Sequence, residues 1–516
     1  MYCKTCGTLL QNGTCPKCGA CGNGGGGSAL AILAVIPAFL LALVFLIAPF
    51  FKTLLLSMKN YSPARGIFGS AWVGFQNFSK VTEGVYFSGL LGNTFLQGML
   101  CLLAGAVVVF LLTGCAAFIK NKWLRCGFLS IILLPVILPM HLFVTKILPM
   151  AWLMSPAWYR LVPVLNEMLR IAPLAVLAGS FALSGGFAWK RVWFVTLCYA
   201  GLRLALLLFP DMQMQLATYN PAVYETADVL STFSYRTGMM NADYSSGAAV
   251  YILQLVLNLL PWLAGCIGLL MITGSHGRTA QRLNSNQRAA VLPAGIIGAS
   301  VLAIVVGVLL SLLATFFLRM ECRVFGSILF SAACCLAAAV FALGLAYPMI
   351  AGNGMVSAVA LVLGLFLLPL CSNWMGLSLH TREMQMINTL WGVLFQNATW
   401  GILAAFGLAA AADGRRELDG KAFALRILPP AIAFLGIGFC FFYTDAYLYP
   451  LLFLNDKTMY PLTMILREIL VTGGAAMSAE PMPPALSRLL SLSYLVPAVV
   501  GLAGIWIGTL TIQKEK

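Results

Sequence analysis

The chain has 516 residues, of which 9 % are charged and 61 % are hydrophobic, and its formal net charge is +15. Soluble globular proteins contain about 25 % charged residues, so this composition argues against an ordinary cytosolic enzyme, a disordered protein and a nucleic-acid-binding module. It predicts an all-α protein that crosses a membrane many times, because long apolar helices tolerate so few charges.

The first predicted element is a small metal site in residues 1–21. The segment YCKTCGTLLQNGTCPKCG contains two C-x2-C pairs separated by eight residues. Four thiolates can hold a structural Zn2+ tetrahedrally, and the predicted ligands are Cys3, Cys6, Cys15 and Cys18. The segment looks like the zinc ribbons attached to many bacterial membrane proteins, with a disulfide pair or chance spacing as the alternative. No basic cluster or aromatic ladder lies beside it, so nucleic-acid binding is not predicted.

After a glycine-rich tether at 22–28, twelve apolar stretches are long enough to cross a bilayer, which takes about 20 residues. The first half, 29–273, contains the stretches 29–51, 90–118, 127–148, 162–183, 192–209 and 247–273. The second half, 291–516, contains 291–318, 324–350, 355–375, 388–412, 427–445 and 485–512. The support is least for 192–209, which is short, and for 162–183, which carries Glu167 and Arg170.

The placement of Lys and Arg favours cytoplasmic N- and C-termini. In this orientation the polar segment 274–290 is a cytoplasmic linker, and short cytoplasmic loops carry clustered basic residues. Examples are Lys120, Lys122, Arg125, Lys190 and Arg191. A thiol metal site also favours a reducing compartment for the N-terminus. The sequence therefore predicts a multi-pass protein of the cytoplasmic membrane.

Several polar segments occur in the same order as in a known family of transport proteins. In the first half they are WVGFQNF (72–78), GNTF (92–95), LLPVILPM (133–140) and NPAVYETADVLSTFSYRTG (220–238). They resemble the permease subunits of bacterial carbohydrate ABC importers, the binding-protein-dependent transport inner-membrane components, and in particular the polysaccharide and oligosaccharide-uptake branch. There, a near-identical N-P-A-V-Y-E-T-A-D-V segment followed by Y-R-x-G precedes the last span.

The second half resembles the partner permease of the same importers. The segments that carry this resemblance are INTLWGVLF (387–395), YPLLFLND (449–456) and YPLTMILREIL (460–470). The resemblance covers most of 29–516 and implies two six-helix permease halves fused in one chain. It further implies cytoplasmic ABC ATPase subunits, an extracellular solute-binding lipoprotein and a carbohydrate substrate moved by alternating access.

The resemblance also places two cytoplasmic loops that would couple to the ATPase. The first corresponds to Gly185, Trp189 and Lys190, and the second to Asp419 and Gly420. Both depart from the family pattern: the first lacks its Glu, both Ala and the Pro, and the second is about four residues short. The alternative for 413–421 is a solvated charged turn. No G-x-x-x-x-G-K-[ST] motif occurs, so ATP would be hydrolysed on another chain.

Polar residues inside predicted spans are candidates for a substrate pathway. They are Gln254, Asn258, Gln396, Asn397 and Asp445, with Trp391, Trp400 and Tyr443 as aromatic faces for sugar stacking. The alternative for each amide is a hydrogen bond to a neighbouring helix. Arg203 is expected to snorkel or to pair with Asp211. No His and carboxylate set has the spacing of a hydrolase or metalloenzyme, so catalysis is not predicted.

The leading hypothesis is therefore a fused permease of a carbohydrate ABC importer. A second hypothesis is a degenerate permease that no longer transports and acts as a zinc-ribbon scaffold or sensor in the membrane. A third, an ion- or proton-coupled carrier, is supported only by the number of spans.

Overall fold

The computed structural model describes residues 35–140, 143–182, 189–277, 291–351, 354–394, 398–412, 420–467 and 484–511. The predicted zinc ligands, the tether and nearly all of the linker 274–290 lie outside these residues, as do Gly185, Gln396, Asn397 and Asp419. Those predictions therefore remain predictions. The described part is helical throughout, apart from one pair of two-residue strands.

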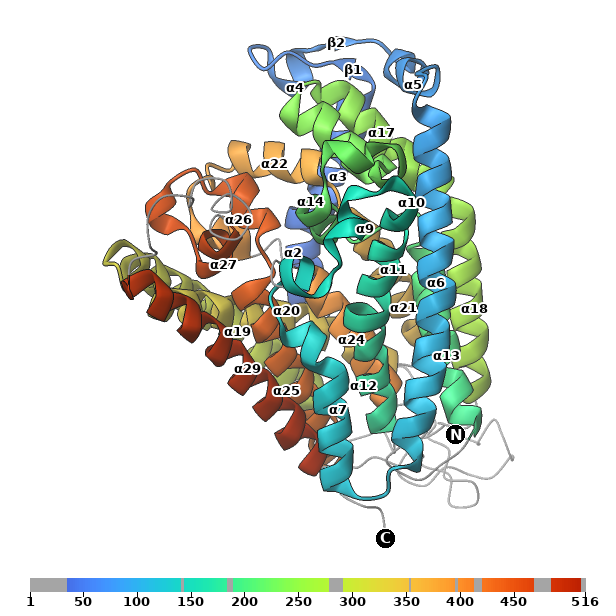
Figure 1. The fold of residues 1–516 in the computed structure, drawn as a ribbon, viewed down its shortest axis with the longest axis vertical. Coiled ribbons are helices and arrows are strands. Elements are labelled where there is room, and N and C mark those ends of the chain that lie inside the picture. The colour runs from blue at the N-terminus through green and yellow to red at the C-terminus, as the bar shows by residue number, and fades with distance from the viewer. Residues whose placement is uncertain are drawn as a thin grey trace, which may run out of the picture.

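The first half begins with a membrane helix, a small subdomain and two long helices. Their bounds are α2 (Ile36–Ala42), η1 (Leu43–Ile47), α3 (Ala48–Ser57), β1 (Lys59–Asn60), α4 (Gly66–Gly69), β2 (Ala71–Trp72), α5 (Gln76–Thr82), α6 (Phe87–Phe118) and α7 (Lys122–Ile137). The two strands pair antiparallel, with Lys59 opposite Trp72. Figure 1 shows this subdomain above the upper end of α6.

The rest of the first half contains both short helices and long ones. These are η2 (Phe143–Ile147), α9 (Met150–Met154), α10 (Pro156–Tyr159), α11 (Leu161–Asn166), η3 (Glu167–Ile171), α12 (Ala172–Ala182), α13 (Trp189–Ala205), α14 (Met212–Thr218), η5 (Pro221–Val223), α15 (Tyr224–Ala227), α16 (Leu230–Tyr235), η6 (Arg236–Met240), α17 (Tyr244–Leu257) and α18 (Leu259–Gly277). Here η1, η2, η3 and η6 are π-helical turns and η5 is a 3-10 turn.

The second half follows a similar order of long and short helices. These are α19 (Val291–Arg319), α20 (Arg323–Ala351), α21 (Gly354–Leu370), α22 (Trp374–Glu383), α23 (Leu390–Leu394), α24 (Ala398–Ala412), α25 (Gly420–Thr444), α26 (Leu448–Phe453), η7 (Lys457–Met459), α27 (Leu462–Arg467) and α29 (Pro484–Leu510). The element η7 is a 3-10 turn.

Seven helical segments in the described part are long and apolar enough to cross a membrane, or up to nine if each of two bent pairs counts as one span. The seven are Ile36–Ser57, Phe87–Phe118, Pro156–Ala182, Gly295–Arg319, Arg323–Ile350, Leu390–Ala411 and Ile427–Thr444. The bent pairs are Tyr244–Leu257 with Leu259–Thr273, at 42°, and Met355–Leu370 with Trp374–Glu383, at 82°. An all-α, multi-pass membrane protein agrees with this arrangement.

The predicted stretches overlap long helices in the described part of the chain, but three of these helices fall short of a full span by length. These are α7 with 16 residues, α13 with 17 and the described apolar part of α29, Leu495–Leu510. The prediction of one continuous helix over 127–148 is wrong. The helix ends at Ile137 because Pro139 has no backbone N–H with which to continue the hydrogen-bond ladder.

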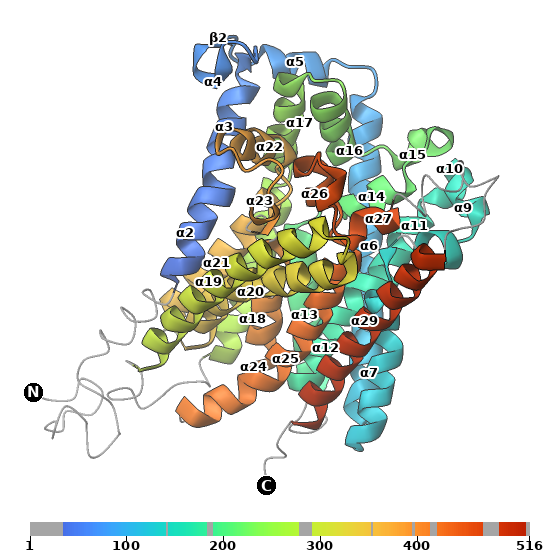
Figure 2. The same ribbon diagram turned by 90° about the vertical axis from the view of Figure 1, so that its left-hand side faces the viewer.

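The two halves share one hydrophobic core instead of forming separate bodies. Its buried side chains include Leu133, Ile137 and Phe181 from the first half and Phe341 and Ile437 from the second. Several pairs of helices pack between the halves: among them, α29 packs along α7, α12 on α24, α3 on α22 and α2 on α20 (Figures 1 and 2). Rearranging the halves would therefore require a change in a continuous packed interface.

Close helix packing requires glycine at some positions. Helix α6 contains one such glycine and one that has space for a side chain. A Cβ on Gly98 would lie 2.1 Å from the carbonyl oxygen of Leu207, whereas a Cβ on Gly92 meets nothing within 4 Å. We expect Gly98→Ala to lower the free energy of unfolding by about 1–3 kcal/mol through overpacking. Gly92→Ala should raise it by up to about 1 kcal/mol through helix propensity. Unfolding by SDS titration in mixed micelles measures both, and a stabilising Gly98→Ala would contradict the packing.

Candidate functional site

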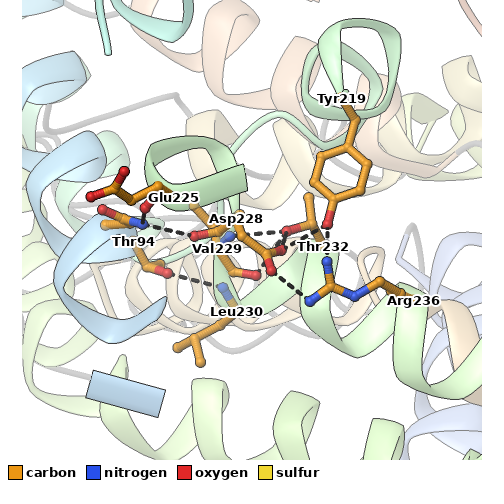
Figure 3. Close-up of polar contacts among 9 residues, drawn as sticks. Thr94, Tyr219, Glu225, Asp228, Val229, Leu230, Thr232 and Arg236 are labelled. Atoms are coloured by element: carbon orange, nitrogen blue, oxygen red, sulfur yellow. Dashed lines mark hydrogen bonds and ion pairs between the residues drawn. The ribbon is translucent and has the colours of Figure 1, made fainter. Parts of the chain in front are cut away.

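Two sequence motifs that lie far apart along the chain meet at the N-terminal end of α6. Asn93 and Thr94 belong to GNTF, and they contact the segment 220–238 that precedes α17 (Figure 3). Asn93 Nδ2 donates to the carbonyl of Glu225 at 2.8 Å and to that of Asp228 at 3.2 Å. The buried Thr94 Oγ1 accepts from the backbone N–H of Leu230 at 3.0 Å. The side chains of α6 therefore hold the backbone of this segment by an amide and a hydroxyl.

Within the segment, the Asp228 carboxylate is the centre of a polar network. It accepts from Thr232 Oγ1 at 2.7 Å, from Tyr219 OH at 3.0 Å and from Arg236 Nη2 at 2.6 Å. The Arg236 guanidinium also lies 5.6 Å from the centre of the Tyr224 ring. Burial and the neighbouring carboxylate raise the pKa of the Tyr219 hydroxyl, which keeps it a donor. The network neutralises both charges and fixes the chain direction before α17.

The second half has one contact of the same kind and others with different geometry. The buried Ser327 Oγ, on α20, accepts from the backbone N–H of Leu462 at 2.9 Å, as Thr94 does from Leu230. Asn388, from INTLWGVLF, accepts through Oδ1 from the N–H of Asn455 at 2.6 Å. Its own N–H donates to the carbonyl of Phe453 at 2.8 Å. In both halves, a side chain of the second long helix and an Asn thus hold the segments that carry the family resemblance.

A buried ion pair joins the halves where α7 breaks. Arg170, in the π-helical turn η3, pairs with Asp445, directly after α25, and their side chains are 6 % and 3 % exposed. Arg170 Nη1 also donates to the carbonyls of Pro135 at 2.8 Å and Leu138 at 2.7 Å. Asp445 Oδ1 accepts from the N–H of Met140 at 2.5 Å. One ion pair from two halves therefore satisfies backbone groups on both sides of the break at Pro139.

A second buried ion pair lies one turn earlier on the same helix. Glu167 Oε2 is 3.1 Å from Arg203 Nε on α13, and Glu167 also accepts from the hydroxyl of Tyr199. The expectation that Arg203 snorkels or pairs with Asp211 is wrong, because Glu167 is nearer. Asp211 instead accepts from Asn166 and caps α14. Both charges of each pair are compensated within the membrane, as the desolvation of ions requires.

The predicted pathway residues have identifiable neighbours. Gln254 Nε2 donates to the carbonyl of Leu208 at 2.5 Å and to Ser231 Oγ at 2.8 Å. Asn258 Nδ2 donates to the carbonyl of Ala205 at 2.8 Å. Both amides therefore bind the backbone at the end of α13, the alternative considered from the sequence. Of the five candidates, only Asp445 lies between the halves in the described part of the chain.

The predicted aromatic and coupling residues differ in their surroundings. Trp400 and Tyr443 are buried and stack on Phe441 and Phe439, whereas Trp391 is partly exposed. Trp189 and Lys190 begin α13, and Gly420 begins α25. Contact of these residues with a sugar or an ATPase stays a prediction.

Sequence reasoning missed Arg170 and Glu167 as site residues, although a signal existed. The two opposite charges, three residues apart, stand in an otherwise apolar stretch, where charges are rare and usually paired. In the sequence these two charges only reduce the support for 162–183 as a membrane span. Their partners were unpredictable, since Asp445 is 275 residues away. No group of three or more potential metal ligands occurs within the described residues.

Comparison with known proteins gives limited similarity. No protein-family model matches the chain, and no curated protein does. One similar solved chain comes from a crystal structure of a bacterial alginate ABC transporter in complex with an alginate pentasaccharide-bound periplasmic protein. It is 21 % identical with a TM-score of 0.36, covering 45 % of this chain and 91 % of that one.

A second similar chain comes from a bacterial ABC transporter involved in the import of the acidic polysaccharide alginate. Its identity and TM-score are the same, and the match covers 45 % of this chain and 92 % of that one. A TM-score of this size is too low to transfer a function.

Proposed function

We propose that the chain is the transmembrane permease component of an ABC importer for an oligosaccharide or another carbohydrate. The supporting observation is that sequence motifs that resemble those of importer permeases are in contact with each other in the first half and again in the second. Thr94 and Asn93 hold the segment before the last helix of the first half, and Ser327 and Asn388 hold the corresponding segments of the second half. Motifs retained by chance would have no reason to meet in both halves.

In this proposal each half acts as one permease, and a separate cytoplasmic ATPase drives alternating access. In this orientation the segments held by these contacts lie on the outer side of the membrane, where a solute-binding lipoprotein would deliver the sugar. The ion pair between Arg170 and Asp445 would hold the halves together near the middle of their contact. The predicted orientation, with cytoplasmic termini in a bacterial cytoplasmic membrane, belongs to the same proposal, as does the structural Zn2+ at the N-terminus.

The test is reconstitution of the intact chain in vesicles with its candidate ATPase and solute-binding protein. We expect uptake of a labelled oligosaccharide that requires ATP and is lost when the P-loop lysine of the ATPase is replaced. A matched pair of variants tests the contact between Asn93 and the segment 220–238. Asn93→Leu removes the donor to the carbonyls of Glu225 and Asp228, whereas Gln97→Leu changes the same helix one turn away. Asn93→Leu should lower the uptake rate more than Gln97→Leu.

Two other outcomes would overturn the proposal in favour of the alternatives. Stable binding of the ATPase without any uptake, for all sugars tried, would indicate a degenerate permease that serves as a scaffold or sensor. Uptake that survives ATP depletion but stops when the proton gradient is collapsed would indicate an ion-coupled carrier.

A further inference from the structure

Basic residues from two separate loops gather at the lower end of the first half. Lys120 follows α6, Lys122 and Arg125 lie in the first turn of α7, and Lys190 and Arg191 lie in the first turn of α13. The ends of α6 and α13 are in contact, because Ala117 packs on Val192 and the rings of Phe118 and Trp189 are 6.4 Å apart. Figure 1 shows these ends at the same level of the molecule.

Three of these cations have no ion-pair partner among the residues that the structure describes. None of the five ion pairs within the described residues involves Lys120, Lys190 or Arg191. Lys120 and Lys190 are exposed and Arg191 is partly exposed. A cluster of exposed cations of this kind attracts an anion to the surface.

Apolar and aromatic side chains surround the same cluster. Trp189 and Trp193, whose rings lie against Phe110 of α6, are 51 % and 53 % exposed. Tryptophans with this exposure are typical of the boundary between bilayer and water. Above them, exposed Leu111 and Val107 continue the apolar surface of α6 along its length. A ligand at this place therefore has a charged part facing the cations and an apolar part facing α6.

We propose that the inner ends of α6, α7 and α13 form a binding site for an anionic phospholipid. The phosphodiester of the headgroup binds Lys120, Lys190 and Arg191, and the acyl chains lie along the exposed apolar face of α6. Basic clusters next to membrane helices bind anionic headgroups in this way. A soluble phosphate would use the cations alone and leave the adjoining apolar and aromatic surface without a role. The inference does not depend on the proposed transport function, because lipid binding needs neither ATPase nor sugar.

The test measures lipid preference with the purified intact chain in vesicles of phosphatidylcholine and dibrominated phosphatidylglycerol. Brominated acyl chains quench tryptophan fluorescence, and Trp189 and Trp193 lie at the site. The test variant replaces Lys120, Lys190 and Arg191 by glutamine. We expect its preference for phosphatidylglycerol over phosphatidylcholine to fall at least about tenfold.

Two matched variants make the result specific. The control replaces three exposed arginines outside this cluster by glutamine, namely Arg65, Arg160 and Arg382, which removes the same charge. It should keep its preference within about twofold. A charge-preserving variant with Arg, Arg and Lys at positions 120, 190 and 191 should restore binding, which separates charge from folding.

Either of two results would overturn the inference. An equal loss of preference in the test and control variants would show that only the overall charge matters. Displacement of brominated phosphatidylglycerol by inorganic phosphate at constant ionic strength would show a site for a free anion instead of a lipid.

Discussion

Replacing Asp445 by leucine is expected to lower the free energy of unfolding by about 3–5 kcal/mol, one of the two largest effects of a single change in this protein. The substitution leaves the guanidinium of Arg170 buried, and an arginine side chain cannot become neutral by losing its proton. It also leaves the N–H of Met140 without its acceptor. SDS titration of the protein in mixed micelles measures the change.

The control for this prediction is Asp445→Asn, which removes the charge but keeps an oxygen for the Met140 N–H. Its effect should be smaller than that of leucine by about 1–3 kcal/mol, the usual effect of one unsatisfied buried donor. If Asp445→Asn and Asp445→Leu unfold alike and close to the parent chain, the ion pair between the halves does not hold them together.

The second large effect is expected for Glu167→Leu, again about 3–5 kcal/mol. This change leaves Arg203 as an uncompensated charge in the membrane and removes the acceptor of the Tyr199 hydroxyl. The opposite change, Arg203→Leu, should be milder. A carboxyl group that loses its partner can take up a proton and become neutral, and the Tyr199 hydroxyl still donates a hydrogen bond to Glu167.

The prediction is tested by comparing the loss of unfolding free energy in Glu167→Leu with that in Arg203→Leu. Unfolding of both variants in the same micelles, with Trp262→Phe as a substitution elsewhere in the membrane part, gives the comparison. Trp262 makes one hydrogen bond, to the carbonyl of Leu365 at 3.2 Å, so its loss should remain near 1 kcal/mol. A larger effect for Arg203→Leu than for Glu167→Leu would mean that Arg203 supports the fold through contacts other than this ion pair.

The two ion pairs connect one helical segment to different parts of the protein. Glu167 faces α13 within the first half, whereas Arg170, three residues later, faces α7 and the second half. The π-helical turn that contains both residues, Glu167–Ile171, widens the helix at this point. The same helix therefore connects the inside of one half to the boundary between halves.

The sequence by itself determined the all-helical membrane architecture and the approximate positions of many of its long helices. Apolar stretches such as 90–118 and 324–350 coincide with α6 and α20, because a bilayer requires continuous runs of apolar residues whatever their neighbours are. The sequence also singled out GNTF and the segment 220–238, since polar residues at fixed spacing are visible along one chain.

Only the tertiary structure decided which of these residues meet. That α7 ends at Ile137, that Asp445 pairs with Arg170 and that Gln254 binds the end of α13 depend on contacts across many residues. Hydrophobic periodicity records which residues avoid water, but not the partner that compensates a buried charge or a broken helix. Those partners follow from packing, which brings distant segments within hydrogen-bond distance only in the folded protein.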